Sequence, residues 1–363
     1  MSGNSQWPKP LSAADILLGL SGSAPPSHSQ QNGLFGALAA PPPQNFLGLL
    51  GETYRRRNEW NDRFAHWQRP ASVTEEGTID RAERNVHRAI DGNLWLNDQD
   101  VIIRPQGSYH HNTNVRVEAD IDLRAEHPAT KVEYHHNVVQ DAARGVLGYS
   151  GLGLTEGQVF AQMRTELIAD LGRKFGYLNV VSGKKAIRIR GITGSRAEVD
   201  IVPTIQYHYV LWNDLQARYD VLEGVAILST DGRWTVNFPE QHYTNGVAKN
   251  NRTARRFKRT ARIFKRLRAD MQTRGMFFTE IPSFLIECLV YAVEDRYFLV
   301  ESDDAYDRVL RVARRMKELL SPATIQPLTE INEIKLLFHH SQPWRPETAT
   351  AFVNAAIAHL GEG

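Results

Sequence analysis

Two aspartates one residue apart, flanked by apolar residues, constrain this chain more than any other feature. The segment from Ala119 to Leu123 reads ADIDL. Alternate residues of a strand point to the same face, so Asp120 and Asp122 share one face while Ile121 and Leu123 point into the core. Two carboxylates on one face repel each other, and apolar burial does nothing to offset that repulsion. We therefore expect this face to lie at a site where a counter-charge binds.

A third aspartate occurs in the same kind of pattern further along the chain. Asp200 stands between Val199 and Ile201 in the segment AEVDIV. If the two strands are neighbours, three carboxylates converge, which costs on the order of a few kcal/mol per pair at an effective dielectric constant near 20. Magnesium is the usual counter-charge because it prefers hard oxygen ligands. Two Mg²⁺ ions, or Mn²⁺ in their place, would activate an attacking hydroxyl and hold a leaving pyrophosphate.

A glycine-serine turn precedes the first aspartate pair. Gly107 lets the backbone approach a phosphate closely, and the hydroxyl of Ser108 can donate a hydrogen bond to it. A lone Asp-x-Asp or a lone Gly-Ser is common and carries little information. The ordered combination of Gly-Ser, eleven residues (109–119), Asp-Ile-Asp and a distant Val-Asp-Ile is specific, and it indicates phosphoryl chemistry.

Hydrophobic periodicity and turn signals predict an α+β fold in two lobes. Strand patterns occur in VIIRP, VEADIDLRAE, KAIRIRG and AEVDIVPTI, and a helical pattern at 156–176 is expected to cover one face of their mixed, largely antiparallel sheet. Before the sheet, helices are expected over 46–67 and from a Ser72–Glu75 capping box to Ile90. After residue 245 nearly everything reads as helix: 250–274, 282–294, 303–320, 328–338 and 346–360.

Composition sets the expected domain boundaries and excludes several classes of protein. Residues 1–45, rich in Ser, Gly, Ala and Pro, read as a flexible leader, followed by a core at 46–240 and a helical lobe at 241–363. The single cysteine, Cys288, excludes an intrachain disulfide or a cysteine-based zinc site, and its apolar surroundings predict a buried small hydrophobe. No apolar run reaches the length of a membrane span, so we expect a cytoplasmic protein with no membrane partner.

A strongly basic helix is expected near the start of the helical lobe. Between Lys249 and Arg274 there are eleven Lys or Arg residues against one acid, Asp270. A charge run of this kind is usually a solvated face of a helix. The alternatives are that one side of the helix neutralises a bound triphosphate, or that it contacts the phosphates of a nucleic acid.

Together these motifs resemble the polymerase-beta-like nucleotidyltransferase superfamily, whose pattern is Gly-Ser, Asp-x-Asp and a later Asp. Within it, PQGSYHHNTNVRVEADIDL is similar to the bacterial cGAS/DncV-like nucleotidyltransferases, or CD-NTases. The stretches NFPEQHYTNGVAKNNRTARRFKRTARIFKRLR, IPSFLIECLVY and SVTEEGTIDRA also match in order and spacing. The resemblance covers roughly residues 70–320 and leaves the leader uncovered.

The resemblance implies a role for each matching residue. Asp120, Asp122 and Asp200 would bind two Mg²⁺ ions, and Asp200 would also help to deprotonate the attacking ribose hydroxyl. Contacts to the nucleotide triphosphate are implied for a second set: Gln106, Gly107, Ser108, Lys258, Arg262 and Ser283. Phe284 would either stack on a base or pack in the core, with packing favoured.

The function implied by the resemblance is the joining of ribonucleoside triphosphates such as ATP into a cyclic di- or trinucleotide. Such products act as second messengers on a downstream effector in anti-phage (CBASS) defence, and accessory proteins would act at the C-terminal Gly363. Activation by DNA is not expected, because the cysteines of a zinc-bound thumb are absent. Two alternatives stay open: a template-independent RNA-end nucleotidyltransferase, and a catalytically inactive nucleotide- or RNA-binding module.

Overall fold

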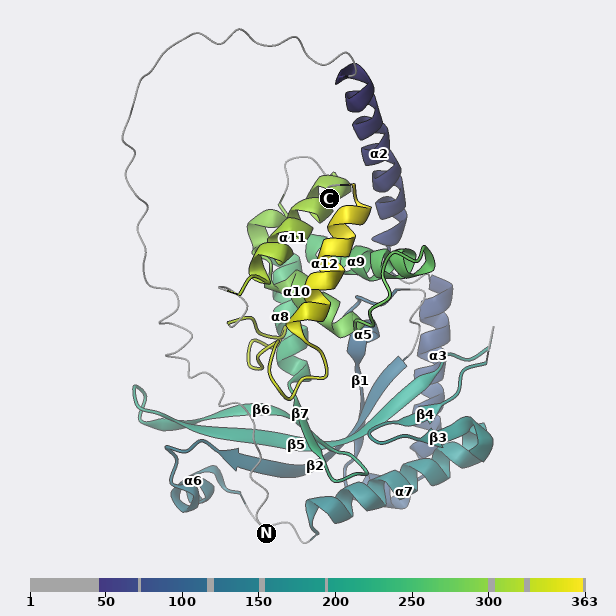
Figure 1. Ribbon diagram of the computed structural model, residues 1–363. Helices are drawn as coiled ribbons and strands as arrows, with labels where there is room; N and C mark the ends of the chain where they lie inside the picture. The colour runs from purple at the N-terminus through teal and green to yellow at the C-terminus, as the bar shows by residue number, and fades with distance from the viewer. Residues whose placement is uncertain are drawn as a thin grey trace.

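The computed structural model describes residues 46–70, 73–115, 121–149, 154–192, 195–299, 304–322 and 327–361. The predicted leader at 1–45, Asp120 and Gly363 lie outside these residues. A twisted sheet with helices on one side forms one lobe, and a bundle of helices forms the other (Figure 1). The predicted α+β class with a helical C-terminal lobe is confirmed.

Within the described residues the sheet has seven strands, and it is mixed, as expected. The path β1 (Ile102–Gln106), β2 (Ile121–Tyr134), β5 (Val199–Asn213), β4 (Ile187–Ile189) and β3 (Val180–Ser182) is extended by β6 (Arg218–Leu228) on β5 and β7 (Trp234–Asn237) on β6. Among these strands β2 and β5 pair in parallel, and the other pairs are antiparallel. The long β5 therefore lies beside both β2 and β4 where it begins.

Helices cover one face of this sheet. The long α7 (Glu156–Phe175) begins at a capping box made by Thr155 and Gln158, and it packs with α3 (Val73–Ile90) under the sheet (Figure 1). The short α4 (Leu94–Asp98), α5 (Gly107–His110), α6 (Gln140–Leu147) and η1 (Tyr177–Asn179) lie in the connections. Ile121 and Leu123 are buried in the core between sheet and helices, as the strand alternation predicts. The carboxylate of Asp122 between them therefore points to the opposite face.

The second lobe is built from helices that share their own apolar core. It contains α8 (Pro239–Arg252), α9 (Arg256–Thr273), α10 (Ser283–Ala292), η2 (Asp295–Tyr297), α11 (Ala305–Leu319) and α12 (Pro346–His359). The predicted burial of Cys288 is confirmed, since its side chain in α10 is fully buried.

The predicted core at 46–240 includes the helix α2 (Phe46–Trp67), but α2 contacts the helical lobe instead. Trp60 and Phe64 are buried in the core of the helical lobe, and α2 packs on α9 and α11 (Figure 1). Sequence proximity to the sheet does not reveal this packing, because the partners of α2 lie far along the chain. The division of the chain after residue 240 otherwise stays a prediction.

Two predicted helices differ from the structure. The helix expected from residue 250 begins only at Arg256, because Ala254 and Arg255 adopt positive φ and the Thr253 hydroxyl accepts from the Phe257 amide. The helix expected at 328–338 is wrong. Asn332 instead accepts hydrogen bonds from the amides of residues 334 and 335, and Leu328 and Leu337 pair across a turn. A side chain that satisfies nearby amides in this way competes with a helix.

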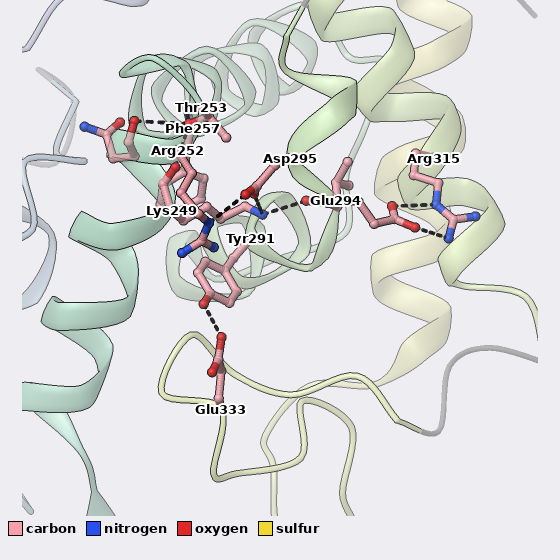
Figure 2. Close-up of polar contacts among 11 residues, drawn as sticks. Lys249, Arg252, Thr253, Phe257, Tyr291, Glu294, Asp295, Arg315 and Glu333 are labelled. Atoms are coloured by element: carbon pink, nitrogen blue, oxygen red, sulfur yellow. Dashed lines mark hydrogen bonds and ion pairs between the residues drawn. The ribbon is translucent and has the colours of Figure 1, made fainter. Parts of the chain in front are cut away.

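A polar network joins α8 to the end of α10, and one further hydrogen bond ties the non-helical segment to α10 (Figure 2). The buried Lys249 donates to the Val293 carbonyl (2.7 Å) and pairs with Asp295 (3.0 Å), which also binds Arg252 (2.7 Å). From α10, the Tyr291 hydroxyl donates to the carboxylate of Glu333. Glu333 lies in the turn that replaces the predicted helix, so this hydrogen bond ties the turn to α10.

Candidate active site

Asp122 and Asp200 lie directly opposite each other on neighbouring strands. The β2–β5 register pairs Asp122 with Asp200, and the β1–β2 register pairs Asp122 with Gln106. In-register residues of adjacent strands point to the same face. The predicted convergence is therefore confirmed for these two carboxylates. Asp120, the third member expected, lies outside the described residues.

The Gly-Ser turn lies against this carboxylate pair. Gly107 has a φ of +73°, and a Cβ added to it would lie 2.8 Å from Cγ of Asp122. Only glycine tolerates both the left-handed backbone and this approach. The turn is closed by the carbonyl of Ser108, which accepts from the amides of Thr113 (2.9 Å) and Asn114 (3.1 Å). Ser108 is thereby held beside the strand that carries Asp122.

An arginine supplies a counter-charge that was not identified from the sequence. Arg188 on β4 is in register with Asp200, and its Nε and Nη2 each donate to the Asp200 carboxylate at 2.8 Å. The same guanidinium approaches Glu198 at 3.1 Å. The alternation in KAIRIRG places Arg188 on a polar face, but only the pairing of β4 with β5 brings it to Asp200.

A cavity of about 620 Å³ opens at these residues, between the two lobes. The core contributes its lining from the Gly-Ser turn, the β3–β4 turn and the strands: Gln106, Gly107, Ser108, His111, Asp122, Lys185, Asp200, Thr235, Asn237 and Phe238. The helical lobe contributes residues of α8, of α10 and of the segment before α12: Pro239, His242, Ser283, Phe284, Glu287, Glu330, Asn332, Lys335, Gln342, Pro343 and Trp344. The structure thus brings Gln106, Gly107, Ser108, Asp122, Asp200 and Ser283 together at one cavity.

The two predicted basic contacts do not line this cavity. Arg262 is buried, and its guanidinium donates to the backbone carbonyls of Gln68 (2.8 Å) and Asn112. Lys258 lies behind the cavity wall, with its ammonium 5.9 Å from the ring centre of Tyr243. Burial, and secondarily the charge of Arg262, lowers the pKa of Lys258. The cations that line the cavity come from other positions in the chain.

Those cations are Lys185 and Lys335, which the sequence did not single out. Both line the cavity, one from the turn between β3 and β4 and one from the segment predicted as a helix. Burial and the nearby charge of Lys335 lower the pKa of Lys185. The Lys335 ammonium donates to the Val236 carbonyl at 3.1 Å, so it bridges the two lobes. A basic residue in a turn gives no sequence pattern that distinguishes it from a solvated one.

Aromatic rings form one wall of the cavity. The imidazole of His242 stacks on Phe284, with ring centres 5.6 Å apart, and Trp344 lies 5.8 Å from Phe284. On its other side His242 lies 4.1 Å from the ring of His111. Burial lowers the pKa of His242 to about 4, and burial together with His242 lowers the pKa of His111 to about 2. Both rings are therefore neutral at neutral pH. Phe284 therefore both packs against neighbouring rings and lines the cavity.

The donor set at the cavity fits a magnesium ion. Asp122 and Asp200 offer hard carboxylate oxygens side by side, which Mg²⁺ prefers to nitrogen or sulfur. Among the residues that the structure describes, no group of three or more His, Cys, Asp or Glu side chains is placed to hold a metal. Because Asp120 lies outside the described residues, the described part of the chain contributes Asp122 and Asp200 to this metal site.

Comparisons with known proteins agree with this fold and site. Residues 244–361 match the model of the cGAS/DncV-like nucleotidyltransferase C-terminal helical domain. The chain is 34% identical over 303 residues to the cyclic dipyrimidine nucleotide synthase CdnE of Legionella pneumophila, covering 83% of this chain and 98% of that one. Identity to the synthase of the same name from Cecembia lonarensis is 29% over 302 residues, covering 82% and 97%.

A solved structure gives the same picture. The CdnE cyclic dinucleotide synthase of Elizabethkingia meningoseptica, determined with GTP and Apcpp, superposes with a TM-score of 0.65 at 27% identity, covering 83% of this chain and 98% of that one. Fold and site define a nucleotidyltransferase. The chain belongs to the cGAS/DncV-like nucleotidyltransferase family. Within the described part of the chain, no helix is both long and apolar enough to traverse a bilayer.

Proposed function

We propose that this enzyme joins ribonucleoside triphosphates into a cyclic di- or trinucleotide, releasing pyrophosphate, with Mg²⁺ held by Asp122, Asp200 and Asp120. The observation that carries the proposal is the in-register pairing of Asp122 with Asp200 beside the Gly107-Ser108 turn, in a cavity shared by both lobes. Relatives that match nearly their whole length to this chain are cyclic nucleotide synthases. This favours cyclic nucleotide synthesis over RNA-end transfer and over an inactive binding module.

Residues of both lobes bind the nucleotide triphosphate. The backbone at Gly107 and the hydroxyl of Ser108 contact the triphosphate from the core, while Ser283 contacts it from α10. Lys185 and Lys335 supply positive charge at the same cavity. A cation beside a phosphate forms charge-assisted hydrogen bonds, which are stronger than neutral ones. Lys258 and Arg262, predicted for this role, are not among the residues that line the cavity.

The aromatic wall suits the nucleobase. Phe284 and Trp344 line the cavity, and His242 stacks on Phe284. A base stacked on aromatic side chains gains about 1–3 kcal/mol and tolerates base identity. The wall therefore orients the base without selecting its identity.

For the chemistry itself the carboxylates orient an attacking ribose hydroxyl in line with an α-phosphate. Asp200 accepts the proton of that hydroxyl. When bound, Mg²⁺ supplies charge stabilisation for the attacking oxygen and the pyrophosphate leaving group. Arg188, hydrogen-bonded to Asp200, holds that carboxylate in place before the ion binds.

A single assay tests the proposal. The protein is incubated with all four ribonucleotides and Mg²⁺ or Mn²⁺, then treated with phosphatase, and surviving products are identified by mass spectrometry. A phosphatase-resistant cyclic nucleotide, lost in the Asp122→Ala/Asp200→Ala variant, is expected. Elongation of added tRNA, or no product under any condition, would contradict the proposal. The anti-phage role of the product, its effector and the C-terminal role of Gly363 stay predictions.

A further inference from the structure

The turn from Gly107 to Asn114 is held from outside by the basic helix α9. Within the turn, the carbonyl of Ser108 accepts from the amides of Thr113 and Asn114. The carbonyls of Asn112 and Thr113 accept from two cations of α9, Arg262 and Lys265. The turn is thus held by its own backbone hydrogen bonds and also by charged donors from α9 in the helical lobe.

Lys265 is fully buried and has two partners. Its Nζ donates to the Thr113 carbonyl at 3.0 Å and pairs with the buried carboxylate of Glu287 on α10. Replacing a buried ion pair by apolar residues of similar volume is often neutral or stabilising, because desolvation offsets the Coulomb attraction. Stability alone is therefore a weak reason for this pair, whereas a fixed donor for the Thr113 carbonyl is a specific one.

Arg262 uses its donors in the same way one turn earlier on α9. Its Nε donates to the Gln68 carbonyl at 2.8 Å, and Nη1 donates to the Asn112 carbonyl. Burial lowers the pKa of Arg262 to about 10, so the guanidinium stays charged at neutral pH. A charged donor to a buried carbonyl makes one of the stronger hydrogen bonds in a protein. The buried side of the basic helix is thus committed to backbone carbonyls.

We propose that Lys265, held by Glu287, and Arg262 are positioning residues that fix the 107–114 turn and, through it, the orientation of Ser108 toward bound nucleotide. The inference rests on the proposed function, because it concerns the serine assigned to the triphosphate. Part of the positive charge of the basic helix α9 then serves to align the phosphate-binding turn. It also couples the lobes, since α9 and α10 belong to the helical lobe and the turn belongs to the core.

The main test replaces the buried pair with apolar residues of similar size, Lys265→Met with Glu287→Leu. We expect an unchanged or higher Tm, faster deuterium uptake in peptides covering 107–115, and a kcat/KM lowered about 10- to 100-fold, as for a misplaced catalytic contact. Because the pair is proposed to act through Ser108, its effect should shrink to under about twofold in a Ser108→Ala background, as expected for coupled residues.

A matched control is a second ion pair of the helical lobe in which the lysine is buried. Lys249→Met with Asp295→Leu removes a pair that does not contact the turn. We expect this control to leave deuterium uptake at 107–115 unchanged, and its effect on kcat/KM to multiply with that of Ser108→Ala. Should the first variant lose more than about 10 °C in Tm, Arg262→Lys carries the same test, because it keeps a buried cation but has one donor group for two carbonyls.

Unchanged uptake at 107–115, or an effect that multiplies with Ser108→Ala, would overturn the positioning role. Faster uptake with unchanged kcat/KM would overturn it as well, because the turn would then move without consequence for catalysis. Failure of the proposed function is distinguishable: the unmodified protein would make no cyclic product. Deuterium uptake is measured without nucleotide, so it reports on the anchoring of the turn in either case.

Discussion

Gly107 and Asp122 lie in such close contact that a Cβ at position 107 would lie 2.8 Å from Cγ of Asp122 and 2.9 Å from its Cβ. Gly107 also has a φ of +73°, which side chains with a Cβ rarely adopt. The glycine therefore meets two requirements at once, one set by the backbone and one set by the carboxylate that the site needs.

Gly107→Ala should abolish activity by displacing Asp122. We expect product formation to fall at least about 100-fold, since displacements near 1 Å have effects of that size. Gly148→Ala is the matched control, because Gly148 has a φ of +72° but no atom within 4 Å of an added Cβ. Both variants share the backbone strain, about 1–2 kcal/mol, so Tm should fall similarly. Equal activities of the two variants would show that the contact with Asp122 is unimportant.

Nucleotide binding should require both carboxylates and a divalent ion. A non-hydrolysable triphosphate with Mg²⁺ should raise Tm, because a ligand at 100 times its Kd stabilises the native state by about 2.7 kcal/mol. EDTA should remove most of this shift, and Asp122→Asn with Asp200→Asn should remove it too. Asp220→Asn, in β6 beyond the cavity lining, is the control that keeps the shift. A full shift in EDTA would refute the metal assignment.

Stability should decrease as the pH falls below 6.5. Burial lowers the pKa of His242 to about 4 from an ordinary value of 6.5, so the unfolded chain binds a proton that the native state excludes. The stabilisation is complete above pH 6.5 and is lost between pH 6.5 and 4, with a slope of about 1.4 kcal/mol per pH unit for one such histidine. The pKa of His111 is lowered to about 2, so this histidine also reduces stability as the pH falls.

Urea unfolding at pH 7.5, 6.5 and 5.5 measures this slope. His242→Gln should flatten it, whereas His340→Gln, at an exposed position, should leave it unchanged. A slope that is identical in His242→Gln and the unmodified protein would mean that His242 titrates normally.

The hydrogen bond between Tyr291 and Glu333 should matter for nucleotide affinity (Figure 2). Glu333 lies between Asn332 and Lys335, which both line the cavity. Tyr291→Phe removes the donor, so unfolding free energy should fall by about 1–2 kcal/mol. We also expect the KM for nucleotide to rise several-fold while kcat changes little, because the loosened segment binds substrate but carries no carboxylate of the reaction.

Steady-state kinetics and urea unfolding check this prediction together. Tyr177→Phe, at an exposed tyrosine of η1, is the control for loss of a phenolic hydroxyl. If Tyr291→Phe lowered stability without changing KM, the hydrogen bond would be structural only.

Local sequence pattern determined the elements that carry the chemistry. The alternation around Asp122 and Asp200 predicted two strands with apolar residues buried and carboxylates opposite, and burial of Ile121, Leu123, Val199 and Ile201 agrees with it. Gly107 and Ser108 were recognisable because a glycine turn before such a strand has few other uses. These signals are local, since they depend on period-two alternation and on backbone freedom at one residue.

Tertiary structure decided which side chains surround those elements. The pairing of β4 with β5 brings Arg188 to Asp200, and the turn that replaces a predicted helix brings Lys335 to the cavity. Arg262 belongs to the same basic run as residues on the solvated face, yet it reaches the carbonyl of Asn112, 150 residues away in the chain. Such contacts depend on how strands and helices are placed in space, which periodicity along the chain does not encode. The sequence determined the carboxylates and the turn; packing of the two lobes decided which cations line the cavity and which donate hydrogen bonds to the turn.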